Sequence, residues 1–271
     1  MTGSNSGRWK YFLLFAIGLV AFPTTSLPAA PPRRVVSLNL CTDDLLLLLA
    51  DPGQIVSVSY LSRDPRESAL WRAARRYIGN DGSMLSVAAF KPDLIVASGG
   101  GPRDRGALAH ALGAQFVDLP YLQSLDDLEA GIVRIAAALG QPARGKRLVE
   151  RIAAARRSAP TRSQDAIFLS GGGRSLPAAG LGAEWLRLAG LRQRSLPGDR
   201  ISVETLLRNP PHLLIRSDYR TGEMSREGAW LSHPALRDIP RARTVRTDGR
   251  RWTCMGASLL PEILRLRAAI Q

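Results

Sequence analysis

The chain has 271 residues, a formal net charge of +14 and 22% charged residues. This length is enough for two modest lobes or one large domain. A strongly basic chain suggests a nucleic-acid partner, but here the arginines are scattered and no aromatic residues are interleaved with them to stack on bases, so we exclude nucleic acid.

The amino terminus has the order of a secretory signal peptide. Arg8 and Lys10 precede an uncharged apolar run over residues 11–22, and small residues follow as far as Ala29. The run is shorter than the ~20 residues that cross a bilayer, which favours cleavage near Ala29 over an uncleaved anchor. We therefore expect residues 1–29 to be removed and the rest to reach the periplasm. Without Arg8 and Lys10 the net charge falls by two, to +12, and a basic surface there favours anionic ligands or an anionic membrane face.

Short β-branched segments alternate with helical segments in the first half of the chain. The predicted strands cover residues 34–38, 54–58, 93–97 and 114–118, and the predicted helices cover residues 43–50 and 105–112. This alternation is typical of βαβ units and predicts a parallel sheet.

The alternation stops at two successive helical segments and then resumes. Apolar residues recur at helical spacing over residues 124–139, and a second helix is predicted over residues 142–158 with Pro142 at its first position. Strands are then expected at residues 166–169, 212–215 and 243–246, and helices at 182–189, 203–208 and 257–270.

The expected fold class is therefore α/β, with two Rossmann-like lobes joined by a single long helix and a ligand cleft between the lobes. We place the amino-terminal lobe at residues 33–140, the connecting helix at 141–159 and the carboxyl-terminal lobe at 160–271.

No set of residues predicts catalysis. The sequence has no GxSxG, HExxH or Walker motif, and its three histidines, His110, His212 and His233, lie far apart without a carboxylate or cysteine at ligand spacing. The two triple-glycine turns do not continue as phosphate-binding motifs, so glycine there is expected to let the chain turn where a strand ends. We expect no enzyme, no cofactor and no metal site.

Several segments of both predicted lobes are similar to those of a known family. In the amino-terminal lobe they are VVSLNLCTD at 35–43, SVSY at 57–60 and FKPDLIV at 90–96. In the second lobe they are ISVETLL at 201–207 and PPHLLI at 210–215. These segments resemble the class III periplasmic binding proteins of ABC importers, which carry cobalamin, ferric siderophores or haem. The segments LSHPAL at 231–236 and WTC at 252–254 are also similar to a branch of this family.

The resemblance implies a small-molecule metal chelate as ligand, an ABC permease and its ATPase as partners, and a monomer. It also implies one exposed glutamate on each lobe for docking to permease arginines. Glu204 matches the second of these positions, whereas Leu85 occupies the first. Three explanations stay open: docking is asymmetric, Asp81 substitutes for the missing glutamate, or the partner differs.

By the same resemblance, loops at the strand ends hold the ligand. Tyr60 is expected to face the ligand or to be a half-covered turn residue, and Trp252 either stacks on a macrocycle or anchors the last helix in the core. The expected ligand-binding residues are Asn39, Cys41, Thr42, Tyr60, Ser98, Gly99, Ser170, Gly171, Tyr219, Trp252 and Cys254.

Cys41 and Cys254 follow strand ends in different lobes, and three interpretations of the pair stay open. They form a disulfide across the lobes, they are soft metal ligands, or they are unrelated buried thiols. A periplasmic redox enzyme that uses this pair is the alternative to an importer component, and a sensor or adaptor that borrowed the fold is a third possibility.

Overall fold

The computed structural model describes residues 1–3, 30–101, 104–219, 229–230, 232–236, 239 and 242–270. The predicted signal peptide therefore lies almost entirely outside the described residues. Among the helices that are described, none has both the length and the apolar character needed to cross a membrane. The compact unit that carries the fold is Pro31–Gln271.

The first lobe is built on a five-stranded sheet whose neighbouring strands are all parallel, in the order β3-β2-β1-β4-β5. Its central strands are buried on both faces, as expected for a parallel sheet covered by helices. The strands are β1 (Val35–Ser37), β2 (Ile55–Ser59), β3 (Ile78–Asn80), β4 (Leu94–Ser98) and β5 (Gln115–Leu119).

Helices follow most strands of this lobe. The Asn39 side chain caps the first of them by accepting a hydrogen bond from the backbone N–H of Thr42, at 3.1 Å. The helices are α1 (Leu40–Leu49), α2 (Tyr60–Arg63), α3 (Trp71–Ala74), α4 (Met84–Ala88) and α5 (Arg105–Ala111).

The second lobe repeats the design with a four-stranded parallel sheet in the order β7-β6-β8-β9. Its strands are β6 (Gln164–Leu169), β7 (Leu191–Gln193), β8 (Leu213–Asp218) and β9 (Arg243–Asp248). Its helices are α8 (Leu181–Leu188), α9 (Val203–Arg208) and α11 (Leu260–Ile270). Short 3₁₀ turns are η1 (Gly171–Gly173), η2 (Pro197–Asp199), η3 (Pro234–Leu236), η4 (Gly249–Trp252) and η5 (Ala257–Leu259). The prediction of two α/β lobes with parallel sheets is confirmed.

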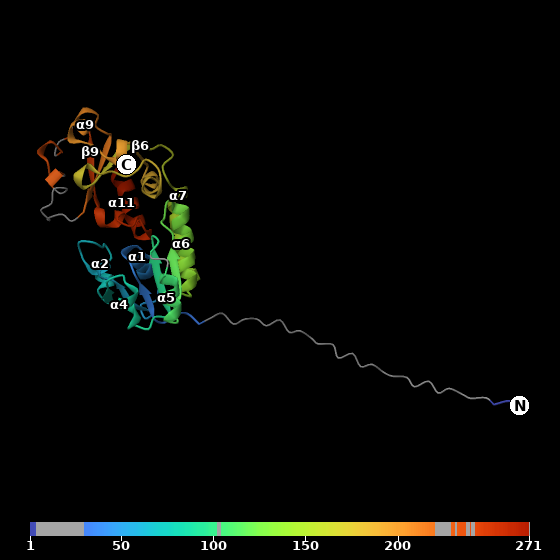
Figure 1. Ribbon diagram of the computed structural model, residues 1–271. Helices are drawn as coiled ribbons and strands as arrows, with labels where there is room; N and C mark the ends of the chain where they lie inside the picture. Colours follow the sequence, from blue (N-terminus) through green and yellow to red (C-terminus); the bar gives the residue numbers. More distant parts are fainter. Residues whose placement is uncertain are drawn as a thin grey trace. The chain divides into compact units, whose positions relative to one another are not determined.

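Between the two sheets the chain forms a pair of helices, α6 (Leu125–Ala138) and α7 (Pro142–Arg157), which run side by side (Figure 1). They approach closely because residue 145 is glycine: a Cβ atom there would lie 2.5 Å from the Cβ of Ala136. Helix α6 also contacts α1 of the first lobe and α8 of the second.

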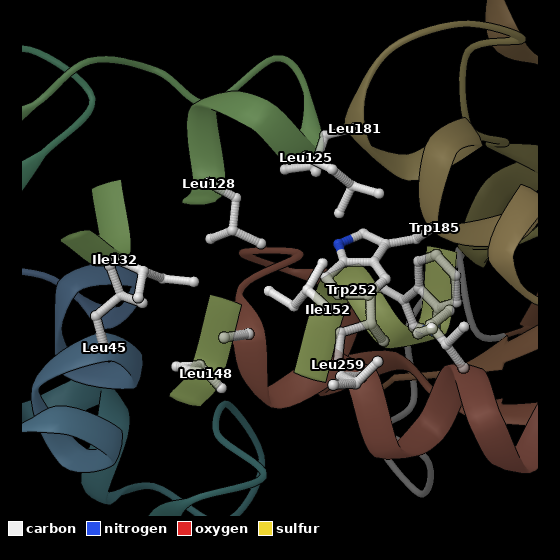
Figure 2. Close-up of a cluster of buried hydrophobic side chains, with 14 of the residues drawn as sticks. Leu45, Leu125, Leu128, Ile132, Leu148, Ile152, Leu181, Trp185, Trp252 and Leu259 are labelled. Atoms are coloured by element: carbon white, nitrogen blue, oxygen red, sulfur yellow. The ribbon is translucent and has the colours of Figure 1, made fainter. Parts of the chain in front are cut away.

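One cluster of buried apolar side chains extends through both lobes. Figure 2 shows Leu45 of the first lobe, Ile152 of α7 and Trp185 of the second lobe in this cluster. Each is essentially inaccessible to water. The two lobes therefore share one core and do not merely touch at a surface.

Candidate functional site

The strand order of the first lobe places its topological switch point between β1 and β4. The chain leaves β1 towards β2 on one side and leaves β4 towards β5 on the other, so the loops at these two carboxyl ends diverge. Ligands of open α/β sheets bind in the crevice that such loops leave. Asn39 follows β1, and Ser98 ends β4 and leads into Gly99. The structure therefore brings together three residues that the sequence had assigned to the ligand.

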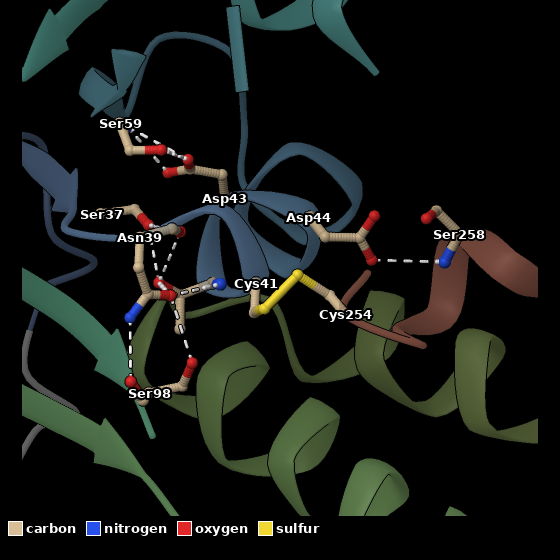
Figure 3. The surroundings of a disulfide bond; sticks show 10 residues. Ser37, Asn39, Cys41, Asp43, Asp44, Ser59, Ser98, Cys254 and Ser258 are labelled. Atoms are coloured by element: carbon tan, nitrogen blue, oxygen red, sulfur yellow. Dashed lines mark hydrogen bonds between the residues drawn. A yellow bond between two sulfur atoms is a disulfide. The ribbon is translucent and has the colours of Figure 1, made fainter. Parts of the chain in front are cut away.

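Asn39 links the two strand ends at this switch point (Figure 3). Its Nδ2 donates to the carbonyl oxygen of Ser98 at 2.9 Å, and its Oδ1 accepts from the Ser98 hydroxyl at 3.2 Å. Thr42 donates to the same Oδ1 from its hydroxyl at 3.0 Å, and its side chain is 0% exposed. Asn39 and Ser98 remain partly accessible. The burial of Thr42 and the hydrogen bonds of its hydroxyl with Ser37 and Asn39 argue against the predicted contact with the ligand.

A buried carboxyl group supports the neighbouring strand end. Asp43, in the first turn of α1, accepts hydrogen bonds from the backbone N–H of Ser59 at 3.1 Å and from the Ser59 hydroxyl. Burial raises the pKa of Asp43 to about 7, and these hydrogen bonds only partly oppose the rise. Ser59 ends β2 immediately before Tyr60. Asp43 thus fixes the backbone that presents Tyr60, a role that the leucine-rich helical pattern gave no reason to expect.

Tyr60 begins α2 and is 58% exposed. It lines a pocket of about 610 Å³ on the first lobe, together with Asp64, Pro65 and three arginines, Arg63, Arg66 and Arg75. Three cationic side chains and one anionic side chain thus line the pocket with Tyr60, which favours negative charge on whatever occupies it.

A second pocket, of about 510 Å³, lies between the lobes. Pro65 and Arg66 of the first lobe line it as well, so the two pockets adjoin, and we call them together the interlobe groove. Its remaining lining residues come from the second lobe: Asp218, Arg246, Thr247, Asp248, Arg250, Glu262 and Arg265.

The groove contains six arginines and four acidic residues. Most of the arginines are positioned by a neighbouring acid: Arg250 donates to Asp248 at 2.8 Å, and Arg246 donates to Asp218. Burial alone would raise the pKa of Asp248, but the hydrogen bonds from Arg250 bring that pKa below its ordinary value. None of these arginines was assigned to the ligand site from the sequence. The run from Tyr60 to Arg66, with two arginines directly after a strand end, was the signal that could have identified them.

The second lobe has its own switch point, between β6 and β8. Ser170 and Gly171 follow β6, and Tyr219 follows β8. The loop needs glycine because Gly173 has φ of +73° and a Cβ there would lie 2.4 Å from the carbonyl oxygen of Ile201. Tyr219 is 37% exposed and donates its hydroxyl to Glu67 of the first lobe. Tyr219 therefore contacts both lobes.

The two cysteines form a disulfide, with Cα atoms 5.2 Å apart (Figure 3). This decides between the three interpretations, because no thiol is left free and no thiolate is available to a metal. Among the described residues there is also no cluster of side chains that could hold a metal ion. A redox enzyme that relies on a free thiol pair finds no support.

Trp252 belongs to the core. It is 5% exposed, its ring lies 4.7 Å from that of Phe168 between centroids, and its Nε1 donates to the hydroxyl of Thr247 at 2.9 Å. A ring packed in this way has no face left for a macrocycle. The burial of Trp252 argues against the ligand contact and favours the other interpretation, an anchor of the last helix in the core.

Glu204 and Leu85 occupy equivalent positions on short helices of the two lobes. Each is the second residue after a capping serine, Ser202 before α9 and Ser83 before α4. A hydrogen bond with Ser202 helps to hold the pKa of Glu204 below its ordinary value, so this carboxylate is charged at neutral pH. Leu85 is 87% exposed. One lobe thus presents a charge where the other presents an apolar side chain.

Two parallel α/β lobes, with a groove at the ends of their strands, define a two-lobed binding protein of class III. A sequence model of the family described as periplasmic binding protein matches residues 35–240, and the chain belongs to this family. No curated protein sequence matches the chain.

Several solved structures have the same fold. The periplasmic haem-binding protein of Pseudomonas aeruginosa is 23% identical, over 88% of this chain and 92% of its own, with a TM-score of 0.62. That of Roseiflexus sp. RS-1 is 21% identical over 88% and 97%, with a TM-score of 0.65. The periplasmic vitamin B12-binding protein of Vibrio cholerae is 17% identical over 88% and 96%, with a TM-score of 0.59. At these identities the likeness establishes the fold.

Proposed function

We propose that this protein is the periplasmic substrate-binding component of an ABC importer and that its ligand is an anionic iron chelate of the haem type. Membership in the periplasmic binding protein family supports the transport role. The ligand class rests on one observation: the exposed Tyr60 lies in a groove lined by arginines.

The chemistry of the groove favours haem over a corrin. Tyrosine oxygen is a known ligand of ferric haem iron, and guanidinium groups pair with carboxylates such as the haem propionates. Trp252, an aromatic residue that would favour a corrin, is buried. Solved structures of similar fold include binding proteins for haem and for vitamin B12, so the fold alone does not choose between them.

Equilibrium titration of the purified mature protein tests the ligand class. Ferric haem, cyanocobalamin and a ferric siderophore are added separately, with tryptophan quenching for all three and the Soret band for haem. We expect haem to bind most tightly. Cobalamin binding tighter than haem would overturn the ligand class, and no binding below the micromolar range for any of them would remove the transport proposal.

Matched variants locate the binding site. Tyr60→Phe should change the Soret spectrum and weaken haem binding, and Arg63→Gln should weaken it without changing the spectrum. Arg147→Gln, on the exposed face of α7, is the control because Arg147 does not line the groove. Equal affinities for all four proteins would place haem elsewhere.

The remaining ligand assignments are kept as part of this proposal. The accessible residues at the two switch points, Asn39, Ser98 and Gly99 in the first lobe and Ser170, Gly171 and Tyr219 in the second, are proposed to complete the site. Cys41 and Cys254 contribute as a disulfide beside the site and not as ligands.

Delivery is proposed to use the permease and ATPase of an importer, with Glu204 docking to a permease cation. The first lobe presents the exposed, uncharged Leu85 at the equivalent position, so only the second lobe would contribute a carboxylate to docking. Glu204→Gln should reduce ligand-dependent ATPase activity of the reconstituted importer while leaving haem affinity unchanged. An unchanged ATPase response would rule out this role for Glu204.

Export, lobe boundaries and oligomeric state belong to the same proposal. We propose cleavage of residues 1–29, which mass spectrometry of the periplasmic fraction would test, and a monomer, which sedimentation would test. We also propose lobes at residues 33–140 and 160–271, joined through residues 141–159. The separation of the two sheets, at residues 35–119 and 164–248, supports this division.

A further inference from the structure

The Cys41–Cys254 disulfide joins the two lobes next to the groove. Cys41 is the second residue of α1 in the first lobe, and Cys254 lies just after η4 in the second lobe. The two residues are 213 positions apart in the chain, yet their Cα atoms are 5.2 Å apart. The covalent link is therefore a second connection between the lobes, in addition to the chain that passes through α6 and α7.

Residues next to Cys41 and Cys254 in the chain also make contacts between the two lobes. Asp44, three residues after Cys41, accepts a hydrogen bond from the backbone N–H of Ser258 at 3.3 Å (Figure 3). A Cβ atom on Gly256 would lie 2.6 Å from a carboxylate oxygen of Asp44, so the second lobe approaches α1 as closely as its backbone allows.

The segment that ends at Cys254 carries a wall of the groove. It begins at Asp248, the last residue of β9, and includes Arg250. Arg250 donates to Asp248 at 2.8 Å within its own lobe and to the carbonyl oxygen of Pro65 in the first lobe at 2.6 Å. Arg250 and Pro65 both line the groove. The disulfide thus fixes the far end of the segment that carries Arg250 over the first lobe.

We propose that oxidation of Cys41 and Cys254 is the covalent modification that sets the width of the interlobe groove, so that the ligand binds a preformed site. In this step the two thiols pass two electrons and two protons to a disulfide of an oxidising partner protein. The Cys41–Cys254 bond forms, and the partner becomes a dithiol. The reduced protein keeps its fold through the shared core but has a looser groove and a lower affinity.

The physical basis is preorganisation. A site that is already held in its binding geometry does not lose conformational entropy when the ligand arrives, so its affinity is higher and its ligand leaves more slowly. The affinity part of this proposal rests on the proposed function, whereas the fixed groove does not require any ligand and is measured without one.

Hydrogen exchange on the ligand-free mature protein tests the fixed groove. Three forms are compared: the oxidised protein, the protein reduced and then alkylated with iodoacetamide, and Cys41→Ser/Cys254→Ser. Protein treated with iodoacetamide without prior reduction is the control, because it has no free thiol to react. We expect exchange over residues 60–67 and 248–254 to accelerate more in the two forms without the disulfide than exchange in β1, β4, β6 and β8, whose amides are exposed only by global unfolding.

The same forms are then titrated with ferric haem, after removal of the reductant so that the iron stays ferric. We expect the dissociation constant to rise about tenfold when the disulfide is absent.

Equal exchange at both segments in all forms overturns the proposal, whatever the haem result. Faster exchange with equal haem affinity overturns the preformed-site part. Faster exchange with no haem binding by any form supports the fixed groove and rejects the proposed function instead. If the double variant fails to fold, the reduced and alkylated protein gives the same readouts.

Discussion

Asp43 shows how one residue can position the site at a cost in stability. Its carboxyl group is buried and accepts hydrogen bonds from the backbone N–H and the hydroxyl of Ser59. Burial disfavours the charged form more than the hydrogen bonds favour it, which raises the pKa of Asp43 to about 7. In the unfolded chain the same group has a pKa near 3.8.

The sign of the resulting pH dependence follows from proton binding. Between pH 4 and pH 7 the unfolded chain releases the Asp43 proton while the folded protein keeps it. The Asp43 contribution to the free energy of unfolding therefore falls as the pH rises through this window and is restored as the pH is lowered.

The variant Asp43→Asn should remove this contribution. We expect wild type to lose stability relative to the variant between pH 4 and pH 7, by an amount on the order of a few kcal/mol. Urea unfolding at several pH values measures the difference. Asp104→Asn, at an exposed position before α5, is the control and should follow wild type. Parallel stability curves for wild type and Asp43→Asn would contradict the assignment.

At the scale of elements, side-chain hydrogen bonds define where helix α6 begins. The Ser124 hydroxyl accepts from the N–H of Asp127 at 3.1 Å, and the Asp127 carboxylate accepts from the N–H of Ser124 at 3.1 Å, a reciprocal capping box. Glu184 of α8 adds an acceptor for the N–H of Leu125, at 2.7 Å. The start of α6 is thus fixed partly by its own sequence and partly by the second lobe.

Replacing the capping serine tests the local part. Ser124→Ala should lower the free energy of unfolding by about 1 kcal/mol, because the N–H of Asp127 loses its acceptor. Ser124→Thr keeps the hydroxyl and should stay close to wild type. Chemical denaturation of the three proteins gives the answer, and an alanine variant as stable as wild type would show that Glu184 alone suffices.

The contact between α6 and α7 depends on a missing side chain. Alanine normally stabilises a helix by about 1 kcal/mol relative to glycine. At position 145 the added Cβ would meet the Cβ of Ala136 at 2.5 Å, and neither atom can rotate away. Overpacking of this kind costs about 1–3 kcal/mol, so the clash exceeds the gain in helix propensity.

Gly145→Ala is therefore expected to destabilise the protein despite the better helix former. In the Ala136→Gly background the same substitution should become neutral or stabilising, because the space is restored. A double-mutant cycle of thermal or urea unfolding measures the coupling. A stabilising effect of Gly145→Ala on its own would mean that the helices move apart freely.

At the scale of the whole molecule, the disulfide and the shared core both hold the two lobes together. The bond closes a loop of 213 residues that contains most of both lobes. Loop closure in the unfolded chain removes more entropy for longer loops, and the chain-entropy relation gives roughly 5 kcal/mol for a loop of this length. Measured disulfides commonly contribute about 2–4 kcal/mol.

Reduction should therefore lower the free energy of unfolding of the mature protein by about 2–4 kcal/mol. Because one apolar cluster runs through both lobes, we expect a single unfolding transition with and without the bond. Guanidinium titrations of oxidised protein and of Cys41→Ser/Cys254→Ser check both points. Two separate transitions in the variant would show that the bond, and not the core, couples the lobes.

Much of the fold could be predicted from local pattern. Helix α9 agrees with its predicted range, and the predicted strands and the longer helices agree within a few residues with those observed. Strands β3 and β7 were missed, because each has three residues and includes a glycine or a charged residue. Their backbone becomes strand only by pairing with β2 and β6, and such pairing leaves no local periodicity.

The sequence by itself determined the alternation of strands and helices, the two lobes and the strand ends at which polar residues collect, since each depends on neighbours within a few positions. Only the tertiary structure decided that Thr42 and Trp252 are buried, that the arginines near Tyr60 line a groove and that Cys41 bonds to Cys254. Burial and pairing of these residues depend on contacts between segments that are distant in the chain, and no local pattern encodes which distant segments meet.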